Sequence, residues 1–315
     1  IKAGDRGRLA EGSSLGQLRV DQVHRAKDGT RKFRLLTHEG SAIESVLIPN
    51  DERGFTQCIS SQVGCALTCA FCATQTLGFS RNLATWEIVD QVYQAQDLLA
   101  AEAAESGAKW PERVQNIVFM GMGEPLHNYN QVKRAVDILT DEHGPNIAGR
   151  RITISSAGLV PAIARFGREG LGNEVGLAIS LNATTDSVRD RVMPINTRWN
   201  IAKLLETVRE VPLHRRQRVT FEYVLLADVN DSDDDARRLN KLVGNMRCQI
   251  NVIPFNPHPK APFRRPSAAR IKRFTELCRK LGLRAFVRTP RGDDIGAACG
   301  QLALKGSKPD ESRPS

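Results

Sequence analysis

The sequence predicts an α/β fold: a partial (β/α)6 TIM-like barrel preceded by a small N-terminal antiparallel β extension. Two observations lead to this prediction. After residue 55, six short apolar segments alternate with helical patterns, and such alternation indicates a parallel sheet with right-handed crossovers. Small and polar residues also follow several of these strands directly, which is where functional residues gather in a curved parallel sheet.

The expected elements follow in chain order. The extension should contain strands at residues 17–23, 32–37 and 41–48, separated by turns at 28–29 and 38–40. The barrel strands are expected near residues 57–61, 116–120, 151–154, 175–181, 218–226 and 249–254. Helices are expected at 130–140, 233–243 and 267–281, and from an N-cap at Thr85 with Trp86, Val89, Val92 and Tyr93 on one face.

These elements divide the chain into an extension over residues 1–55, a core over 56–302 and a mobile tail over 303–315 that is rich in Lys, Pro and Ser. The first residues contain no apolar signal core. The abrupt start at Ile1 raises the expectation of a boundary there or of a missing N-terminal segment.

The composition narrows the class of protein. Lys and Arg number 45 against 35 Asp and Glu, a net charge of +10 that favours a polyanionic partner. No apolar run of about 18 residues is present, so no membrane span is expected. Seven cysteines, clustered and odd in number, do not resemble a secreted disulfide framework and indicate a cytoplasmic location.

Three cysteines in one short loop are the first chemical signal. Cys65, Cys69 and Cys72 are spaced as Cys-x3-Cys-x2-Cys, and thiolates are the ligands of iron-sulfur clusters. Zinc is the competing metal, but no second Cys or His pair follows at finger or ribbon spacing. Three unrelated core thiols are the other alternative. On a [4Fe-4S] cluster, three cysteines would leave one iron free for a small molecule.

Small and polar residues after later strands form a second group. The segment Gly-Met-Gly-Glu-Pro at 121–125 lets a backbone approach a ligand, although taken alone it fits a tight turn better. Ser155, Ser180 and Asn182 either contact a ligand or cap the following helices. Asn256 lies between two prolines, which either direct its amide into the site or form an ordinary turn.

A late cysteine is the third signal. Cys299 lies between small residues in a flexible segment, where a thiol is better placed as a nucleophile than as a core residue. Cys58, just before the cysteine loop, is its possible partner in attack or resolution. Cys248 and Cys278 fit buried core positions better.

Taken together, these motifs resemble a known family. The cysteine spacing is similar to that of the radical S-adenosylmethionine (SAM) superfamily. The order Cys-x3-Cys-x2-Cys, Gly-Met-Gly-Glu-Pro, Ile-Pro-Phe-Asn-Pro and Ala-Ala-Cys-Gly-Gln-Leu resembles the RlmN/Cfr family of RNA methyltransferases from about Glu44 to Leu302. The run Arg291-Gly292-Asp293-Asp294 favours the RlmN branch. Members usually carry a further N-terminal helical domain.

The resemblance implies an activity: methylation of adenine C2 in 23S rRNA and in tRNA, where the Cfr branch methylates C8. It implies that a [4Fe-4S] cluster is held by Cys65, Cys69 and Cys72. It implies that SAM is bound by Gly123, Glu124, Ser155, Ser180, Leu181, Asn182 and Asn256. Many members have His in place of Asn182, but an amide keeps the hydrogen-bonding capacity.

The resemblance also implies catalytic roles. Cys299 would take a methyl group from one SAM, and a radical generated from a second SAM would remove a hydrogen atom from it. The methylene radical would add to C2, and Cys58 would release the protein-RNA crosslink by forming a disulfide with Cys299. Glu44 would accept the C2 proton, its alternative being an exposed strand carboxylate.

The implied partners are 23S rRNA, tRNA and a reducing electron donor such as flavodoxin, with the enzyme acting as a monomer. Two basic segments are candidates for phosphate contact, although either set also suits solvated helix faces: Lys260, Arg264, Arg265, Arg270, Lys272 and Arg273, and Arg215, Arg216 and Arg218. The target adenine would have to be splayed out of its stack. A non-catalytic, metal-stabilised RNA-binding protein is the alternative from another class.

Overall fold

The computed structural model describes residues 17–50, 54–109, 112–259 and 261–304. Ten strands form one sheet: β1 (Arg19–Arg25), β2 (Arg31–Leu36), β3 (Ala42–Asn50), β4 (Gly54–Cys58), β7 (Val114–Phe119), β8 (Ile152–Ser156), β9 (Gly176–Ser180), β10 (Val219–Leu225), β11 (Cys248–Pro254) and β12 (Ala285–Val287). A separate pair consists of β5 (Gln62–Gly64) and β6 (Phe79–Asn82).

The direction of the strands confirms the predicted fold class. β1, β2, β3 and β4 pair antiparallel, and from β4 through β7 to β12 every neighbouring pair is parallel. The six predicted barrel strands are all present. The sequence analysis missed the seventh parallel strand, β12, because its three residues are too few to show a periodic pattern.

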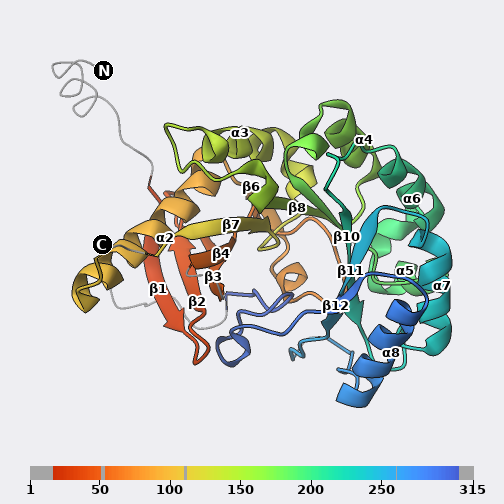
Figure 1. The fold of residues 1–315 in the computed structure, drawn as a ribbon. Coiled ribbons are helices and arrows are strands. Elements are labelled where there is room, and N and C mark those ends of the chain that lie inside the picture. The colour runs from red at the N-terminus through yellow and green to blue at the C-terminus, as the bar shows by residue number, and fades with distance from the viewer. Residues whose placement is uncertain (1–16, 51–53, 110–111, 260, 305–315) are drawn as a thin grey trace.

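Helices cover the outer side of the curved sheet (Figure 1). They are α2 (Thr85–Ser106), α3 (Tyr129–Thr140), α4 (Val160–Arg168), α5 (Asp186–Val192), α6 (Ile201–Arg209), α7 (Asp233–Val243) and α8 (Ala268–Lys280). Short 3-10 turns are η1 (Ala73–Leu77), η2 (Pro125–Asn128), η3 (Gly149–Arg151), η4 (Leu171–Asn173), η5 (Pro194–Thr197) and η6 (Asp293–Ile295). No helix in the described ranges is long and apolar enough to span a bilayer.

Helix α2 departs from its prediction at two points. Ala84, not Thr85, is the N-cap residue, and the Glu87 carboxylate accepts a hydrogen bond from the Ala84 amide at 2.8 Å. Trp86 and Tyr93 are 38% and 41% exposed, because they lie beside the buried stripe of the helix and not on it.

The C-terminal segment, residues 292–302, is held in place by hydrogen bonds near both of its ends. The Gly292 amide donates to Asp28 in the β1-β2 turn at 3.0 Å. Near the other end, the Ala73 amide donates to the Gly300 carbonyl at 2.7 Å and the Thr74 hydroxyl to the Leu302 carbonyl at 2.7 Å. The extension and the cysteine loop therefore hold residues 292–302 together. Most of the tail predicted at 303–315 lies outside the described residues.

Candidate active site

The cysteine loop lies between β5 and η1, after the C-terminal end of β4. Its backbone is closed by the Cys65 amide, which donates to the Gly78 carbonyl at 2.9 Å, and by the Cys72 amide, which donates to the Cys69 carbonyl at 3.0 Å. All three thiols line one cavity of about 160 Å3. The structure therefore brings the three predicted cluster ligands to one place.

The chemistry of these thiols fits a bound cationic group. Burial raises the pKa of Cys65 to about 12, and burial with the neighbouring Cys72 and Cys65 raises the pKa of Cys69. Three buried thiolates are therefore unfavourable unless positive charge compensates them. Within the described residues, no three His, Cys, Asp or Glu side chains are arranged as ligands of a single metal ion.

Glu124 and Gly123 form one wall of this cavity. The Glu124 carboxylate is 3% exposed and accepts hydrogen bonds from the amides of Leu126 at 3.1 Å and Ala157 at 2.7 Å. Burial raises its pKa to about 7. Gly123 has φ +99°, and a Cβ there would lie 2.5 Å from the Gln62 Cβ, so this turn requires glycine.

The other predicted SAM contacts differ in whether their side chains already form hydrogen bonds within the protein. Ser155 and Ser180 line the cavity, and Ser155 donates to the Phe119 carbonyl at 2.5 Å. Asn182 also lines it, but its amide is occupied by the Val224 N–H at 2.7 Å and by the Met193 sulfur at 3.1 Å.

Leu181 and Asn256 differ most in their access to the cavity among the predicted contacts. Leu181 is fully buried and is not among the residues that line the cavity. Asn256 does line it, is 4% exposed, and donates to the Cys299 carbonyl at 3.2 Å. Its Oδ1 has no hydrogen-bond partner within the described part of the chain. That buried acceptor is available to a bound molecule.

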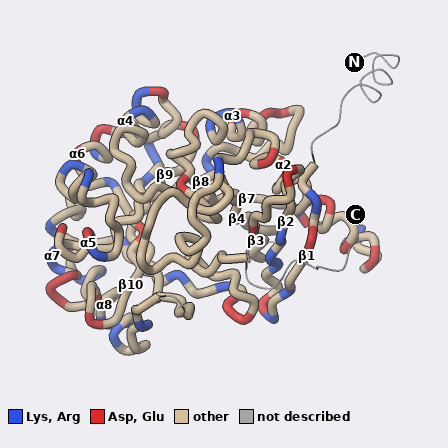
Figure 2. The backbone as a smooth tube through the Cα atoms, turned by 180° about the vertical axis from the view of Figure 1, so that it is seen from behind, with Lys and Arg blue, Asp and Glu red and all other residues tan. Residues whose placement is uncertain are grey.

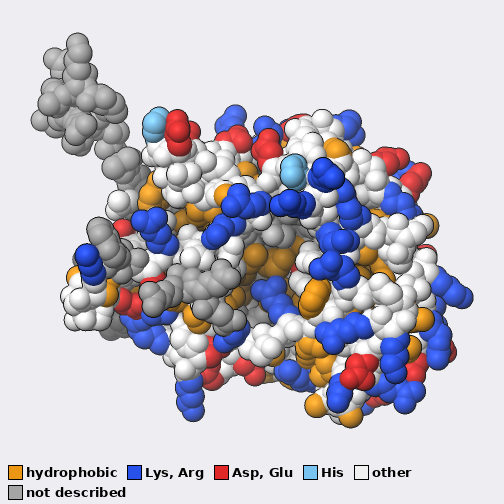
Figure 3. All heavy atoms as spheres, in the orientation of Figure 1, with side chains coloured by type: hydrophobic (Ala, Val, Ile, Leu, Met, Phe, Trp, Pro, Cys, Tyr) orange, Lys and Arg blue, Asp and Glu red, His pale blue; other side chains and the backbone are white. Residues whose placement is uncertain are grey.

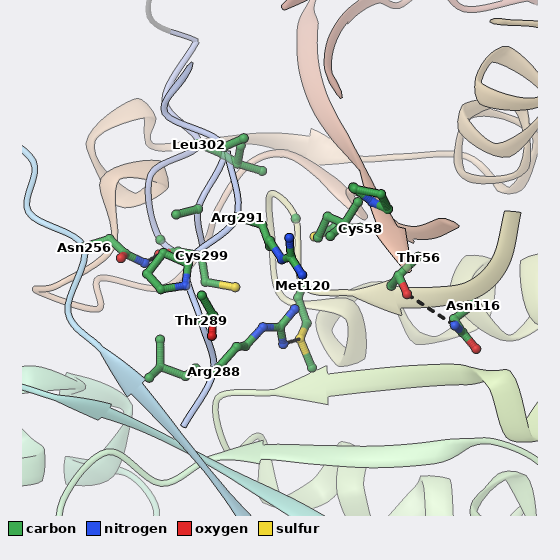
Figure 4. A pocket seen from close by; sticks show the side chains of 18 of the residues that line it. Thr56, Cys58, Asn116, Met120, Asn256, Arg288, Thr289, Arg291, Cys299 and Leu302 are labelled. Carbon is green, nitrogen blue, oxygen red and sulfur yellow. Dashed lines mark hydrogen bonds between the residues drawn. The ribbon is translucent and has the colours of Figure 1, made fainter. Parts of the chain in front are cut away.

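Cys58 and Cys299 point into a second, larger cavity of about 740 Å3 (Figure 4). Burial, with the neighbouring Cys299, raises the pKa of Cys58 to about 12, although Arg288 acts in the opposite direction. All seven cysteines are free, so the disulfide expected between Cys58 and Cys299 is absent from this structure. Both sulfurs face the same cavity, where a bond between them could form and break.

The two cavities adjoin. They share lining residues from the cysteine loop, from the strand ends and from the C-terminal segment: Cys72, Met120, Gly121, Ile253, Asn256, Cys299 and Gly300. A molecule bound beside the three loop cysteines would therefore reach the Cys299 side of the larger cavity.

Two charged residues of the site were missed by sequence reasoning. Arg288 lies in the larger cavity, with Nη1 3.7 Å from the Met120 sulfur, and the charges of Cys299, Glu222 and Cys58 raise its pKa. Glu222 lines the smaller cavity, is 5% exposed, and has one carboxylate oxygen without a partner in the described structure. A carboxylate within the apolar segment Val219–Leu225 was the available signal for Glu222, whereas Arg288 gave none.

Glu44 was expected to be either a proton acceptor or an exposed strand carboxylate. It is buried and forms an ion pair with Lys32 at 3.2 Å, and it accepts a hydrogen bond from the Leu304 amide at 3.1 Å. It lines neither cavity. The exposed alternative is therefore wrong, and the catalytic role stays a prediction.

Variants of this buried pair separate the two roles of Glu44. We expect Glu44→Gln to lower the free energy of unfolding by about 3 kcal/mol or more, because it leaves Lys32 as an uncompensated buried charge. Glu39→Gln, at an exposed ion pair, should change it by less than about 1 kcal/mol. The double variant Lys32→Met/Glu44→Leu should recover most of the stability in urea titrations. If that stable double variant also methylates RNA normally, Glu44 is not the proton acceptor.

The two predicted basic segments differ in their surroundings. Arg264 is paired with Asp228 at 2.7 Å, and Arg270 and Arg273 are both paired with Asp233. Lys260 lies outside the described residues. Both acidic and basic residues lie on α7 and on α8 (Figure 2). This segment is largely neutralised, whereas the segment 215–218 precedes the N-terminal end of β10.

Comparison with known proteins establishes the class. The sequence matches the Radical SAM superfamily over residues 59–240. The structure is similar to the crystal structure of a radical SAM methyltransferase from Sphaerobacter thermophilus, with a TM-score of 0.86, 44% identity, and coverage of 96% of this chain and 86% of that one. The barrel, the cysteine loop and the adjoining cavities are those of a radical SAM enzyme, which uses a [4Fe-4S] cluster and SAM.

The sequence relatives define the family more narrowly. The chain is 47% identical to the dual-specificity RNA methyltransferase RlmN of an Anaeromyxobacter species, over 98% of this chain and 80% of that protein. It is also 47% identical to the RlmN of Desulfotalea psychrophila, over 94% of this chain and 80% of that protein. The chain belongs to the RlmN family and is a radical SAM RNA methyltransferase.

Proposed function

We propose that this enzyme methylates C2 of adenine in 23S rRNA and in tRNA, in the cytoplasm, with Cys299 as the carrier of the transferred carbon. The observation that carries the proposal is the position of Cys299 at the junction of the two cavities, opposite Cys58. The C2 carbon of adenine is not nucleophilic enough for ordinary polar methylation, so its methylation requires a radical reaction. A carbon carried on Cys299 then requires a second thiol to release the product. An RNA-binding protein without catalysis has no use for these two thiols.

The residues of the smaller cavity are proposed to hold the cofactors. Cys65, Cys69 and Cys72 would ligate the [4Fe-4S] cluster, and Glu124 and Asn256 would orient SAM. When bound, the cluster and SAM supply the methyl group and the radical that activates it. An external reductant such as flavodoxin would provide the electron, and we infer that the enzyme works as a monomer.

The residues of the larger cavity are proposed to act on the RNA. Cys299 would hold the carbon as a thioether, and the adenine, turned out of its stack, would occupy the cavity beside it. Arg288 lines the same cavity, and its charge opposes the rise that burial causes in the pKa of Cys58. Cys58 and Cys299 line this same cavity, so the second thiol faces the carbon that the first would carry.

Cys58 is proposed to release the product. Its thiolate attacks the Cys299 sulfur and forms an S–S bond while the bond from that sulfur to the RNA carbon breaks. The electron pair of the broken bond stays on the carbon, which takes a proton and becomes the methyl group. The Cys58–Cys299 disulfide must then be reduced by an external thiol before the next cycle.

The position of the methyl group is tested directly. We expect RNA treated with the reconstituted enzyme to yield 2-methyladenosine on digestion and mass spectrometry. A product that elutes with 8-methyladenosine would replace the proposed position with that of the Cfr branch. Unmodified RNA from protein with an intact cluster would overturn the catalytic proposal altogether.

The resolving role has its own test. Cys58→Ala should accumulate a covalent protein-RNA species on denaturing gels, because no thiolate remains to cleave the bond between sulfur and RNA. Cys248→Ala, which removes a buried thiol that lines neither cavity, should behave like the parent enzyme. Normal yields of methylated RNA from Cys58→Ala, without the adduct, would contradict the role.

A further inference from the structure

Arginine directly precedes most of the parallel strands. Among the described residues, five of these strands begin immediately after an arginine, and each of these side chains is exposed: Arg113 before β7, Arg151 before β8, Arg218 before β10, Arg247 before β11 and Arg284 before β12. We call these five residues the arginine rim.

The strand directions place the arginine rim at one end of the barrel. Neighbouring strands from β4 to β12 are parallel, so the residues before them lie at the same edge, opposite the cysteine loop. The pairing of Val219 with Cys248 sets Arg218 beside Arg247 on adjacent strands. Adjacent strands are about 4.8 Å apart, so the two backbones bring like charges close together.

These charges are not neutralised within the described structure. None of the five arginines forms an ion pair with a carboxylate of the described residues, and the Arg247 guanidinium donates only to the carbonyls of Leu213 and Arg215. Glu112 and Glu174 are the acidic neighbours in sequence at this end. By contrast, Arg264, which follows β11 at the other end, is paired with Asp228. Unpaired like charges on one edge favour a polyanionic partner.

The larger cavity connects this edge with the two reactive thiols. Its lining includes Cys58 and Cys299 and extends to Asn116 and Arg151 at the beginning of β7 and β8. From Asn116 to Met120, also in the lining, the strand advances four residues, or about 13 Å. Figure 3 shows a hollow at the centre of the molecule with Lys and Arg side chains gathered around it. A single nucleotide turned out of its stack could extend through this cavity from the beginning of the strands toward the two thiols.

We propose that the arginine rim binds the RNA sugar-phosphate backbone on both sides of the target nucleotide, and that this nucleotide enters the barrel from the N-terminal ends of the strands. SAM and the cluster would then meet it from the opposite end. This inference rests on the proposed use of the larger cavity by the target adenosine. The arginine rim replaces the segment around Arg264 to Arg273 as the expected RNA contact.

The test compares two variants that each lose three positive charges. The rim variant is Arg113→Gln/Arg218→Gln/Arg284→Gln, which leaves the cavity lining and the carbonyl contacts of Arg247 intact. The control is Arg237→Gln/Arg264→Gln/Lys272→Gln, whose exposed residues lie on α7, after β11 and on α8. The probe is a fluorescent stem-loop RNA with an unpaired adenosine in its loop, titrated by anisotropy at several KCl concentrations.

We expect the rim variant to bind the stem-loop roughly 30-fold or more weakly in about 0.1 M KCl, and the slope of log K against log salt to fall by about two. The control should bind within about threefold of the parent, with the same slope. Equal loss in both variants, or an unchanged slope in the rim variant, would overturn the proposal. Thermal unfolding and SAM affinity of each variant show that neither result comes from misfolding.

A second measurement does not depend on affinity. A photo-crosslinking amino acid at position 284 should attach to the stem-loop beside the target adenosine, and the same group at position 272 should not. Crosslinks from position 272 alone would place the RNA at the other end and refute the inference. Because binding and crosslinking are read without turnover, they remain decisive even if the methylated position proves not to be C2.

Discussion

Replacement of Cys299 by alanine is expected to abolish RNA methylation, with a loss of at least about 10^4-fold, while the affinities for SAM and RNA stay within about threefold of the parent. The reason is chemical. Cys299 is proposed to bear the transferred carbon, and neither alanine nor the far less acidic hydroxyl of serine can accept it. The cavity itself should survive, since Asn256 contacts the Cys299 backbone carbonyl and not its side chain.

Isotope labelling makes this prediction specific. With SAM carrying a deuterated methyl group, the peptide containing Cys299 should gain the labelled methyl in the parent enzyme and remain unlabelled in Cys299→Ala. Cys278→Ala is the matched control, because this thiol is a buried residue of α8 that lines neither cavity. Its loss should cost only about 1 kcal/mol of stability. Labelled RNA produced by Cys299→Ala would remove the central step of the proposed mechanism.

The second large effect is expected at Arg189, which is fully buried and joins the strand ends around the smaller cavity. Its guanidinium donates to the carbonyls of Ala157 at 2.8 Å, Ser180 at 3.0 Å and Leu181 at 3.0 Å, and to the Asn196 side chain at 3.1 Å. Burial lowers its pKa to about 10, which still leaves it charged near neutral pH. One side chain therefore satisfies several buried acceptors at once.

Arg189→Met should lower the free energy of unfolding by about 3–5 kcal/mol, because it leaves those buried carbonyls without donors. SAM affinity should fall with it, since Ala157 and Ser180 line the cavity. Urea unfolding and calorimetric SAM titration measure the two effects. The control Arg191→Met changes an exposed arginine on the same helix and should alter stability by less than about 0.5 kcal/mol. Equal behaviour of the two variants would show that the buried contacts are unimportant.

Much of the fold could be predicted because its signals are local. Each barrel strand is a short apolar segment, and the caps and periodicity of α7 and α8 depend on residues that are close in sequence. For this reason α7 was predicted at its observed bounds. Helices α4, α5 and α6 were missed. Two of them, α4 and α6, have nine residues and α5 has seven, which gives periodicity too few turns to show.

The contents of the site were predictable only in part. Cys65, Cys69 and Cys72 lie close in sequence, so their convergence needs no long-range contact. Arg288 and Glu222 gave no comparable signal, because their roles depend on which strands become neighbours. For Glu44, the alternative of an exposed strand carboxylate was wrong, because the Leu304 amide that donates to it lies 260 residues away in the chain.

The sequence alone determined the order of strands and helices, the cysteine loop and the resemblance to a family, since each depends on residue types and spacing within short stretches. The tertiary structure decided which charges are free. Sheet register sets Arg218 beside Arg247, and neither forms an ion pair with a carboxylate of the described residues. Helix packing, in contrast, brings Asp233 to Arg270 and Arg273. The distance between charges decides their energy, and for residues far apart in the chain only folding fixes that distance.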